Sequence, residues 1–283
     1  MNPVTVVHAA GVDVAITPRP GAPLLLLVRM ASRGAGVWDA VWPALAERFE
    51  VAQFDLAMPA MEELANPAQV FRRFAAQCTH IAEALGHERY HVFGWNGGTH
   101  VALRCAVDAP ARILSCVLLG PFTRLPDMRA VEVGLAVLRT LLKERDAKLY
   151  AAYWFASGLS SKFLATQYDR VEGWVRQRVA TDKFLAADVE RAMRWMVALR
   201  ESWVSHEELA CVRAPVLIVS HDDRWHAGPT VAMAQALAQQ LPTSRHEHIA
   251  GYGSLVLLEA PERFMAIAAP FFATLAGGAS APT

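Results

Sequence analysis

The chain has 283 residues, of which 54% are hydrophobic and 19% charged, an ordinary composition for a globular protein. Lys and Arg together number 27, as do Asp and Glu, so the formal net charge is zero. Because the chain carries no excess of positive charge, we expect no binding to nucleic acid or to an anionic membrane surface. The length favours one large α/β domain, alone or carrying an insertion.

The start of the chain lacks the charged and apolar regions of a secretory signal, and its longest apolar run, residues 23–28, is far too short for a membrane span. The cysteines are scattered without paired spacing, which indicates reduced thiols and neither a disulfide framework nor a metal site. They are Cys78, Cys105, Cys116 and Cys211. We therefore expect a cytoplasmic protein.

Short apolar runs bounded by turn residues predict strands, and longer helical patterns alternate with them. In chain order, strands are expected at residues 4–9, 12–17, 24–28, 49–55, 90–93 and 113–119, with helices at 67–86 and 98–109. After a long gap follow a strand at 216–219, a helix at 230–240, a strand at 245–249 and a helix at 261–275. This alternation is typical of a mostly parallel sheet wrapped by helices.

Residues 123–210 interrupt the alternation, because they contain only helical patterns. An all-helical insertion between two core strands predicts a cap over the carboxyl edge of the sheet, where open α/β sheets bind ligands. We therefore expect a core made of residues 1–122 and 211–283, with a helical cap at 123–210.

Residues 90–100, YHVFGWNGGTH, join a predicted strand directly to a helix. This segment resembles the nucleophile elbow, G-x-S-x-G, of the α/β-hydrolase superfamily. Residues 37–45, 214–219 and 251–262 resemble further landmarks of that family, in the same order along the chain. The resemblance implies an α/β fold with a mostly parallel eight-stranded sheet flanked by helices and an all-helical cap insertion.

The resemblance also assigns the catalytic positions, and two of them hold unexpected residues. Asn96 stands at the nucleophile position, where a carboxamide has no proton that a base could usefully remove. Dehalogenases and epoxide hydrolases of the superfamily carry aspartate there. Ser254 stands at the position of the triad histidine, and a hydroxyl takes up no proton near neutral pH.

The acid position is open between two neighbouring residues. The family's G-x-x-D pattern, counted from the preceding strand, places Arg224 there, and a slip of one residue places Asp223 there instead. Cys105, His100 and His226 lie near the right segments as surrogates. Cys105 is expected beside the sheet and His100 in a packing role, because both lie along the helix that follows the elbow.

The loop that supplies the oxyanion hole also departs from the family's His-Gly, since Arg29 and Met30 stand at these positions. Arg29 would bring a positive charge to the pocket mouth if it points inward. The backbone N–H of Gly97 remains available as an oxyanion donor. Trp95 on the elbow and Tyr252 in the loop before residue 254 complete the expected substrate-binding residues.

With these substitutions the sequence favours a non-hydrolytic site, similar to that of a lyase, cyclase or isomerase, which binds a small carbonyl or carboxylate compound between core and cap. Two alternatives stay open. One is an inert sensor or partner-binding protein, and the other is an unconventional hydrolase or a variant of an enzyme with an aspartate nucleophile. No cofactor and no metal are expected, because neither a G-x-G-x-x-G pattern nor ligand spacing is present. We expect a monomer or homodimer.

Overall fold

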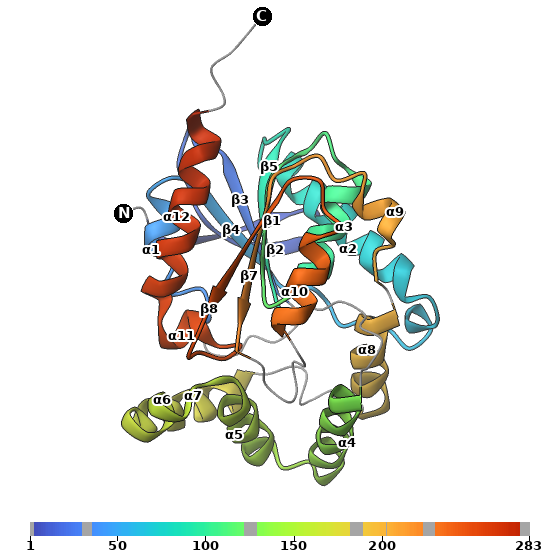
Figure 1. Cartoon of the computed structure of the whole chain (residues 1–283), viewed down its shortest axis with the longest axis vertical. Coiled ribbons are helices and arrows are strands. Elements are labelled where there is room, and N and C mark those ends of the chain that lie inside the picture. Colours follow the sequence, from blue (N-terminus) through green and yellow to red (C-terminus); the bar gives the residue numbers. More distant parts are fainter. Residues whose placement is uncertain are drawn as a thin grey trace, which may run out of the picture.

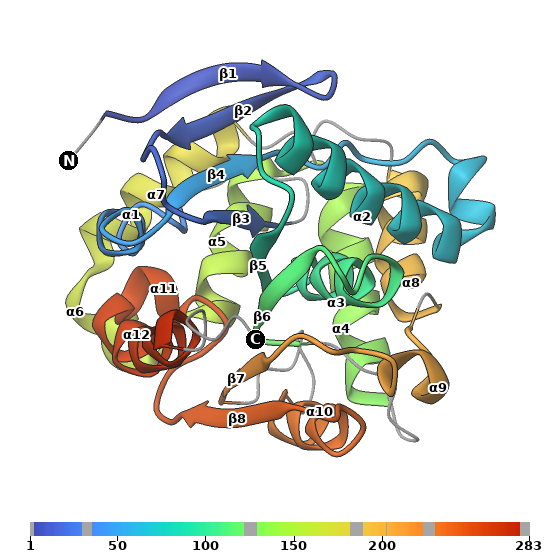
Figure 2. The ribbon, with the colours of Figure 1, turned by 90° about the horizontal axis from the view of Figure 1, so that it is seen from above.

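The computed structural model describes residues 3–29, 36–121, 129–181, 189–201, 203–222 and 230–277. In this part of the chain eight strands form one sheet with the order β1-β2-β4-β3-β5-β6-β7-β8 (Figures 1 and 2). β2 pairs antiparallel with both β1 and β4, and every other pairing is parallel. The strands are β1 (Thr5–Ala9), β2 (Val12–Thr17), β3 (Leu24–Val28), β4 (Glu50–Phe54), β5 (Tyr90–Trp95), β6 (Ile113–Leu119), β7 (Val216–His221) and β8 (Ser244–Ile249). The predicted fold class is confirmed.

Helices cover both faces of the sheet, which explains why its central strands are apolar on both sides. Every residue of β3, LLLLV, is buried, and so is every residue of β5. Figure 2 shows α2, α3 and α10 on one face and α1, α11 and α12 on the other. These helices are α1 (Trp42–Ala46), α2 (Pro67–Ala84), α3 (Gly98–Asp108), α10 (Thr230–Ala238), α11 (Val256–Glu259) and α12 (Pro261–Gly277); the short η1 (Glu63–Ala65) and α9 (His206–Leu209) join them at the periphery.

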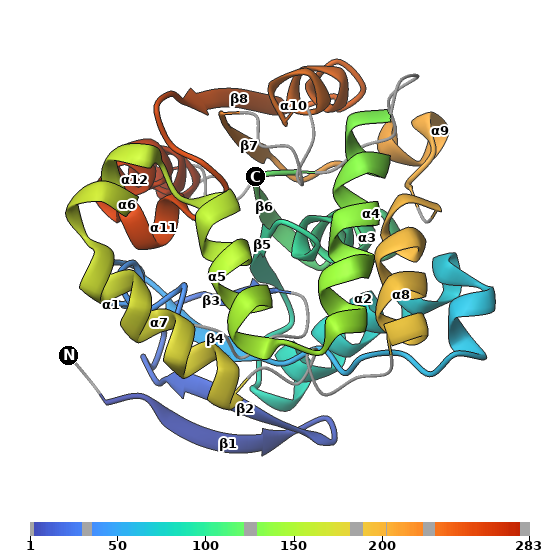
Figure 3. The same ribbon diagram turned by 90° about the horizontal axis from the view of Figure 1, so that it is seen from below.

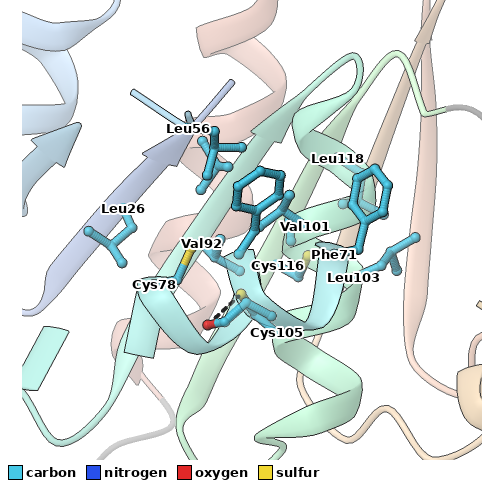
Figure 4. Close-up of a cluster of buried hydrophobic side chains, with 14 of the residues drawn as sticks. Leu26, Leu56, Phe71, Cys78, Val92, Val101, Leu103, Cys105, Cys116 and Leu118 are labelled. Carbon is cyan, nitrogen blue, oxygen red and sulfur yellow. Dashed lines mark hydrogen bonds between the residues drawn. The ribbon is translucent and has the colours of Figure 1, made fainter. Parts of the chain in front are cut away.

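The core on the α2–α3 face combines branched aliphatic side chains of the sheet with aromatic and thiol groups of the helices (Figure 4). Leu26, Val92 and Leu118 come from adjacent strands, and Phe71 packs onto them from α2. The thiol of Cys105, on α3, is 3.8 Å from the carbonyl oxygen of Ala75 on α2, drawn as a dashed line in Figure 4. Cys105 therefore lies beside the sheet, as predicted, and away from its carboxyl edge.

Between β6 and β7 the described residues form helices and no strand. Besides the short α9 given above, there are five: α4 (Arg129–Glu144), α5 (Ala147–Gly158), α6 (Ser161–Thr166), α7 (Tyr168–Thr181) and α8 (Val189–Glu201). Figures 1 and 3 show them gathered across one end of the sheet, with α5 beside α7 and α4 beside α8. All five fall inside the predicted cap, and their role as a cap stays a prediction. No helix in the described ranges is long and apolar enough to cross a membrane.

Candidate functional site

The turn between β5 and α3 forms a tight corner at the carboxyl edge of the sheet. Asn96 occupies its tip with a φ of 47°, a left-handed conformation that asparagine tolerates better than most residues. A Cβ on Gly94 would lie 2.4 Å from the carbonyl oxygen of Gly98, and one on Gly98 would lie 2.1 Å from that of Val28. Only glycine fits at either position, so the corner is built as the sequence motif predicts.

The side chain of Asn96 lies beside Gly120, the residue that follows β6. Its backbone N–H donates to the carbonyl of Leu119 at 2.9 Å, which fixes the corner against the end of β6. Its Oδ1 atom is buried and accepts no hydrogen bond from the described residues. A buried acceptor of this kind is costly unless a donor reaches it, so a donor from solvent or substrate fits this point.

A histidine that the sequence analysis did not select lies beside Asn96. β7 runs two residues beyond its predicted end and finishes at His221, which is fully buried. Nε2 of His221 and Oδ1 of Asn96 lie 2.7 and 2.8 Å from the position that a Cβ on Gly120 would take. The structure thus supplies an imidazole to the elbow from β7, whereas the resemblance predicts one from the loop after β8.

The ring of His221 has a defined tautomer. Its Nδ1 is 2.9 Å from the carbonyl oxygen of Asp222, and because a carbonyl only accepts, Nδ1 carries the proton. Nε2 of the neutral ring is then the basic nitrogen, on the side that faces Asn96. An imidazole oriented in this way can take a proton from a group bound between the two side chains.

Asp222 is itself held firmly to the loop after β8. Its N–H donates to the carbonyl of Tyr252 at 2.9 Å, and its Oδ2 accepts the N–H of Gly251 at 2.9 Å. The carbonyl that orients His221 is therefore fixed by two further bonds of the same residue. Tyr252, predicted to bind substrate, contributes its main chain to this anchor.

A chain of polar side chains extends from Asp222 across β7 and β8. Ser220 Oγ lies 2.8 Å from His246 Nε2 and 3.0 Å from His248 Nδ1, and His248 Nε2 lies 3.3 Å from Asp222 Oδ1. Burial, with the nearby His248, lowers the pKa of His246. Both histidines are thus tied through Ser220 to β7, at the edge of the sheet.

Ser254 lies against the insertion and forms no hydrogen bond with Asn96. Its Oγ is 2.9 Å from the position of a Cβ on Gly158, at the end of α5, and its carbonyl accepts the indole N–H of Trp95 at 3.0 Å. Trp95 and Ser254 are thus brought together, but through the serine main chain. Trp95 also packs edge-on against Trp154 of α5, with ring centres 6.2 Å apart.

Arg29 directly follows β3 and is buried beside the corner, since a Cβ on Gly98 would lie 3.2 Å from its Cα. Its Nη2 is 3.6 Å from Asp55 Oδ1. Burial lowers the pKa of Arg29, an effect that Asp55 opposes.

Three other predicted site residues, Met30, Asp223 and Arg224, lie outside the described residues, as does His226.

Gly97 is the N-cap of α3, so its N–H is at the helix end where backbone donors have no partner within the helix.

His100, considered above as a surrogate base, lies further along the same helix. It packs between Phe71 and Trp203, and burial lowers its pKa to about 4. A neutral, enclosed imidazole serves packing. Among the described residues no group of three or more His, Cys, Asp or Glu could hold a metal ion.

No protein-family model matches the chain. It is 26% identical over 257 residues to the pimeloyl-[acyl-carrier protein] methyl ester esterase of Nitrosomonas europaea, which covers 86% of this chain and 93% of that protein. It is 26% identical over 223 residues to the putative carbamate hydrolase RutD of Klebsiella pneumoniae, covering 75% and 77%. The solved 2-hydroxy-6-oxo-6-phenylhexa-2,4-dienoate hydrolase of Rhodococcus sp. strain RHA1 superposes with a TM-score of 0.75 at 18% identity, covering 95% and 99%.

These relatives overturn the expectation of a non-hydrolytic site. The proteins similar to this chain over most of its length are named as hydrolases of esters and carbamates. The sequence argument equated the loss of histidine at position 254 with the loss of a base. That argument considered no histidine on β7, and the structure places the imidazole of His221 near residue 96.

Proposed function

We propose that this chain, which belongs to the α/β-hydrolase superfamily, hydrolyses a small ester or related acyl compound at the carboxyl edge of its sheet. The observation that carries the proposal is the approach of Nε2 of His221 and Oδ1 of Asn96 to one point beside Gly120. Both atoms lie on the same side of Gly120, and a water molecule that hydrogen-bonds to both has two protons to give.

In the proposed reaction water is the nucleophile. Nε2 of His221 takes one proton as the water oxygen attacks the acyl carbon, while Oδ1 of Asn96 accepts a hydrogen bond from the other, which stays on the water oxygen, and so orients the water. The Nδ1–H of the imidazolium stays on the carbonyl of Asp222. Asn96 is then a positioning group that touches the reacting water, and no bond forms between it and the acyl carbon.

The carbonyl oxygen of the substrate becomes negatively charged as the water attacks. The N–H of Gly97, at the start of α3, supports that charge because backbone donors and the helix dipole both favour an anion there. When the tetrahedral intermediate collapses, the bond to the leaving alcohol breaks and the alkoxide takes the proton back from His221. The products are one acid and one alcohol.

We further propose that α4–α8 act as a cap. α5 contacts the site directly, since Trp154 meets Trp95 and the carbonyl of Gly158 accepts the N–H of Leu255 at 3.1 Å. A cap in this place encloses a small molecule and limits the entry of bulk water, so the ordered water is the one that reacts. The partner we propose is therefore a small-molecule substrate.

The test is hydrolysis of simple esters by the purified chain, followed by acid release in a pH-stat at neutral pH. We expect turnover by the unchanged protein, and a fall of about 10²–10⁴-fold in kcat for His221→Ala, the usual contribution of a general base. His80→Ala is the matched control, because His80 is exposed on α2 and should leave kcat unchanged.

Turnover that survives His221→Ala would contradict the assignment of the base. No turnover of any ester or carbamate by the folded, unchanged chain would contradict the proposed function as a whole.

A further inference from the structure

A cavity of about 600 Å³ lies beside the loop after β8, outside the residues that act in the proposed reaction. Three parts of the chain line it: the start of α6, residues 248–252, and the stretch from the end of α11 into α12. Figure 3 shows α6 beside α11 and α12. Cavities that bind small molecules commonly have volumes of about 300–1,000 Å³, so this one is large enough for an organic ligand.

A pair of hydrogen bonds joins two of these parts. Ser160, the N-cap of α6, donates its N–H to Oε2 of Glu259 at 2.8 Å, and its hydroxyl donates to Oε1 of the same carboxylate. Both oxygens of Glu259 are thus engaged by the protein itself. They hold the start of α6 against the end of α11, which gives the cavity a defined wall between insertion and core.

Two cations line the cavity, Lys162 on α6 and Arg263 on α12, and neither forms an ion pair with a described residue. Arg104, by contrast, is neutralised at close range, with its Nη2 2.8 Å from Oε1 of Glu208. Against the one carboxylate of Glu259, the two cations give this lining an excess of positive charge. Such a lining attracts an anion, and a guanidinium binds carboxylate or phosphate oxygens in a bidentate manner.

The remainder of the lining is largely apolar. It is formed by aliphatic side chains and one half-buried aromatic ring, those of Ile249, Ala250, Tyr252, Ala266 and Ile267. An inorganic ion would leave this surface in contact with water, whereas an apolar group placed against it removes both surfaces from water. The lining therefore matches an anion that carries an apolar body.

The wall formed by the loop after β8 also anchors Asp222. The N–H of Gly251 donates to Oδ2 of Asp222, and the carbonyl of Tyr252 accepts the N–H of Asp222, both at 2.9 Å. His248, in the same lining, is 3.3 Å from Asp222 Oδ1. A ligand that binds this wall only in its ordered arrangement stabilises the contacts that hold the carbonyl in front of His221.

We infer that this cavity is a second binding site, which takes an organic anion with an apolar body and couples its binding to the anchor of Asp222. The charged group binds Lys162 and Arg263, and the apolar body lies against the loop after β8. The inference goes beyond the proposed hydrolysis and does not depend on it, because binding and the stability of the loop are measured without turnover.

The first test is calorimetric titration with phenylphosphonate, with benzamide and inorganic phosphate for comparison. We expect phenylphosphonate to bind about 10-fold more tightly than either, because benzamide lacks the charge and phosphate lacks the ring. Lys162→Gln and Arg263→Gln should each raise its Kd by about 3–10-fold, the loss of one charge-assisted contact. Arg213→Gln is the matched control, because Arg213 is exposed before β7 and does not line the cavity.

The second test is amide hydrogen exchange of Gly251, whose N–H is bonded to Asp222. With phenylphosphonate at about ten times its Kd, exchange through local opening of the loop should slow by about 10-fold, because the ligand binds only the closed arrangement. Amides of β1, at the opposite edge of the sheet, should exchange at unchanged rates.

Equal affinity for phenylphosphonate and benzamide, or a Kd that is unchanged when Lys162→Gln and Arg263→Gln are combined, would overturn the site. Inorganic phosphate that binds as tightly as phenylphosphonate would overturn the role of the apolar lining. Full binding with unchanged exchange at Gly251, or with equal slowing in β1, would overturn the coupling to Asp222.

Discussion

The two sides of the candidate site are built on different principles. The β5–α3 corner is determined by local sterics, because Gly94 and Gly98 are the only residue type that its backbone contacts allow. The β7–β8 edge depends on tertiary contacts, because Nδ1 of His221 donates to the carbonyl of Asp222, which is itself bonded to the loop after β8. The corner follows the elbow motif that the sequence resembles, whereas the edge carries its histidine at the end of β7 and not in the loop after β8.

This difference indicates that the fold determines where the candidate site lies, and determines less strictly which residues line it. The corner presents residue 96 at the edge of the sheet whatever its side chain is. In the proposed reaction the base has only to reach that point, and His221 at the end of β7 lies near it. On this proposal, the same fold accepts its catalytic imidazole from a different strand than the resemblance predicts.

The largest effect is expected at the corner. In Gly98→Ala the new Cβ would meet the backbone of Val28, which no side-chain movement can relieve. We expect a loss of about 3 kcal/mol or more in the free energy of unfolding, measured by denaturant titration. Gly173→Ala is the matched control, because only Arg176 lies within 4 Å of its Cβ position, at 3.9 Å, and alanine favours the helix. An equal loss in both variants would show that the corner is not sterically special.

The next effect is a pH dependence of stability from His100 on α3. Its pKa of about 4 in the folded state lies below the value of 6.5 for an exposed ring, so the unfolded chain binds more protons between these values. Stability is therefore fully present above pH 6.5 and declines as the pH falls towards 4, by about 3 kcal/mol for this group.

Denaturant titrations at several pH values measure this slope. His91, whose pKa is also lowered to about 4, adds a similar contribution, so His100→Leu should remove about half of the slope. A slope that is unchanged in His100→Leu would contradict the assignment of a neutral buried ring.

A smaller effect is expected at the β7–β8 edge. Asp222→Ala removes the carboxylate that accepts the N–H of Gly251 and contacts His248, so the carbonyl that holds His221 becomes less fixed. We expect kcat to fall by roughly 10-fold with little change in KM, as for the loss of one positioning hydrogen bond. Asp222→Asn keeps an acceptor for Gly251 and should restore most of the rate. If both variants matched the unchanged chain, Asp222 would have no positioning role.

Much of the fold could be predicted from the sequence, because its signals are local. All eight strands form where apolar runs predict them, and the helix that begins at Pro67 has the expected cap from Asn66. The site could be predicted only in part. Asn96 and Gly97 follow from the elbow motif, but His221 lies outside the predicted strand, because the apolar run ends at residue 219. A strand extended through Ser220 and His221 would have placed His221 at the carboxyl edge of the sheet. The proximity of His221 to Asn96, however, depends on strand pairing that a single sequence does not reveal.

The burial of Arg178, on α7, could not be predicted from the sequence for a related reason. It lies in a helix with many exposed charges, and nothing in the spacing of α7 distinguishes it from Arg176. Its burial against Trp154 arises from the packing of α7 on α5. Residues at the contact between insertion and core therefore require the structure.

The most direct test of the account is the intact mass of the protein during turnover of an aryl acetate, sampled from the first turnover onward. In the proposed reaction, water between Asn96 and His221 attacks the substrate directly, so the protein mass should stay unchanged while acetate and phenol form at equal, steady rates. A protein heavier by one acyl group, on residue 96, on Ser254 or elsewhere, with a burst of phenol, would contradict it.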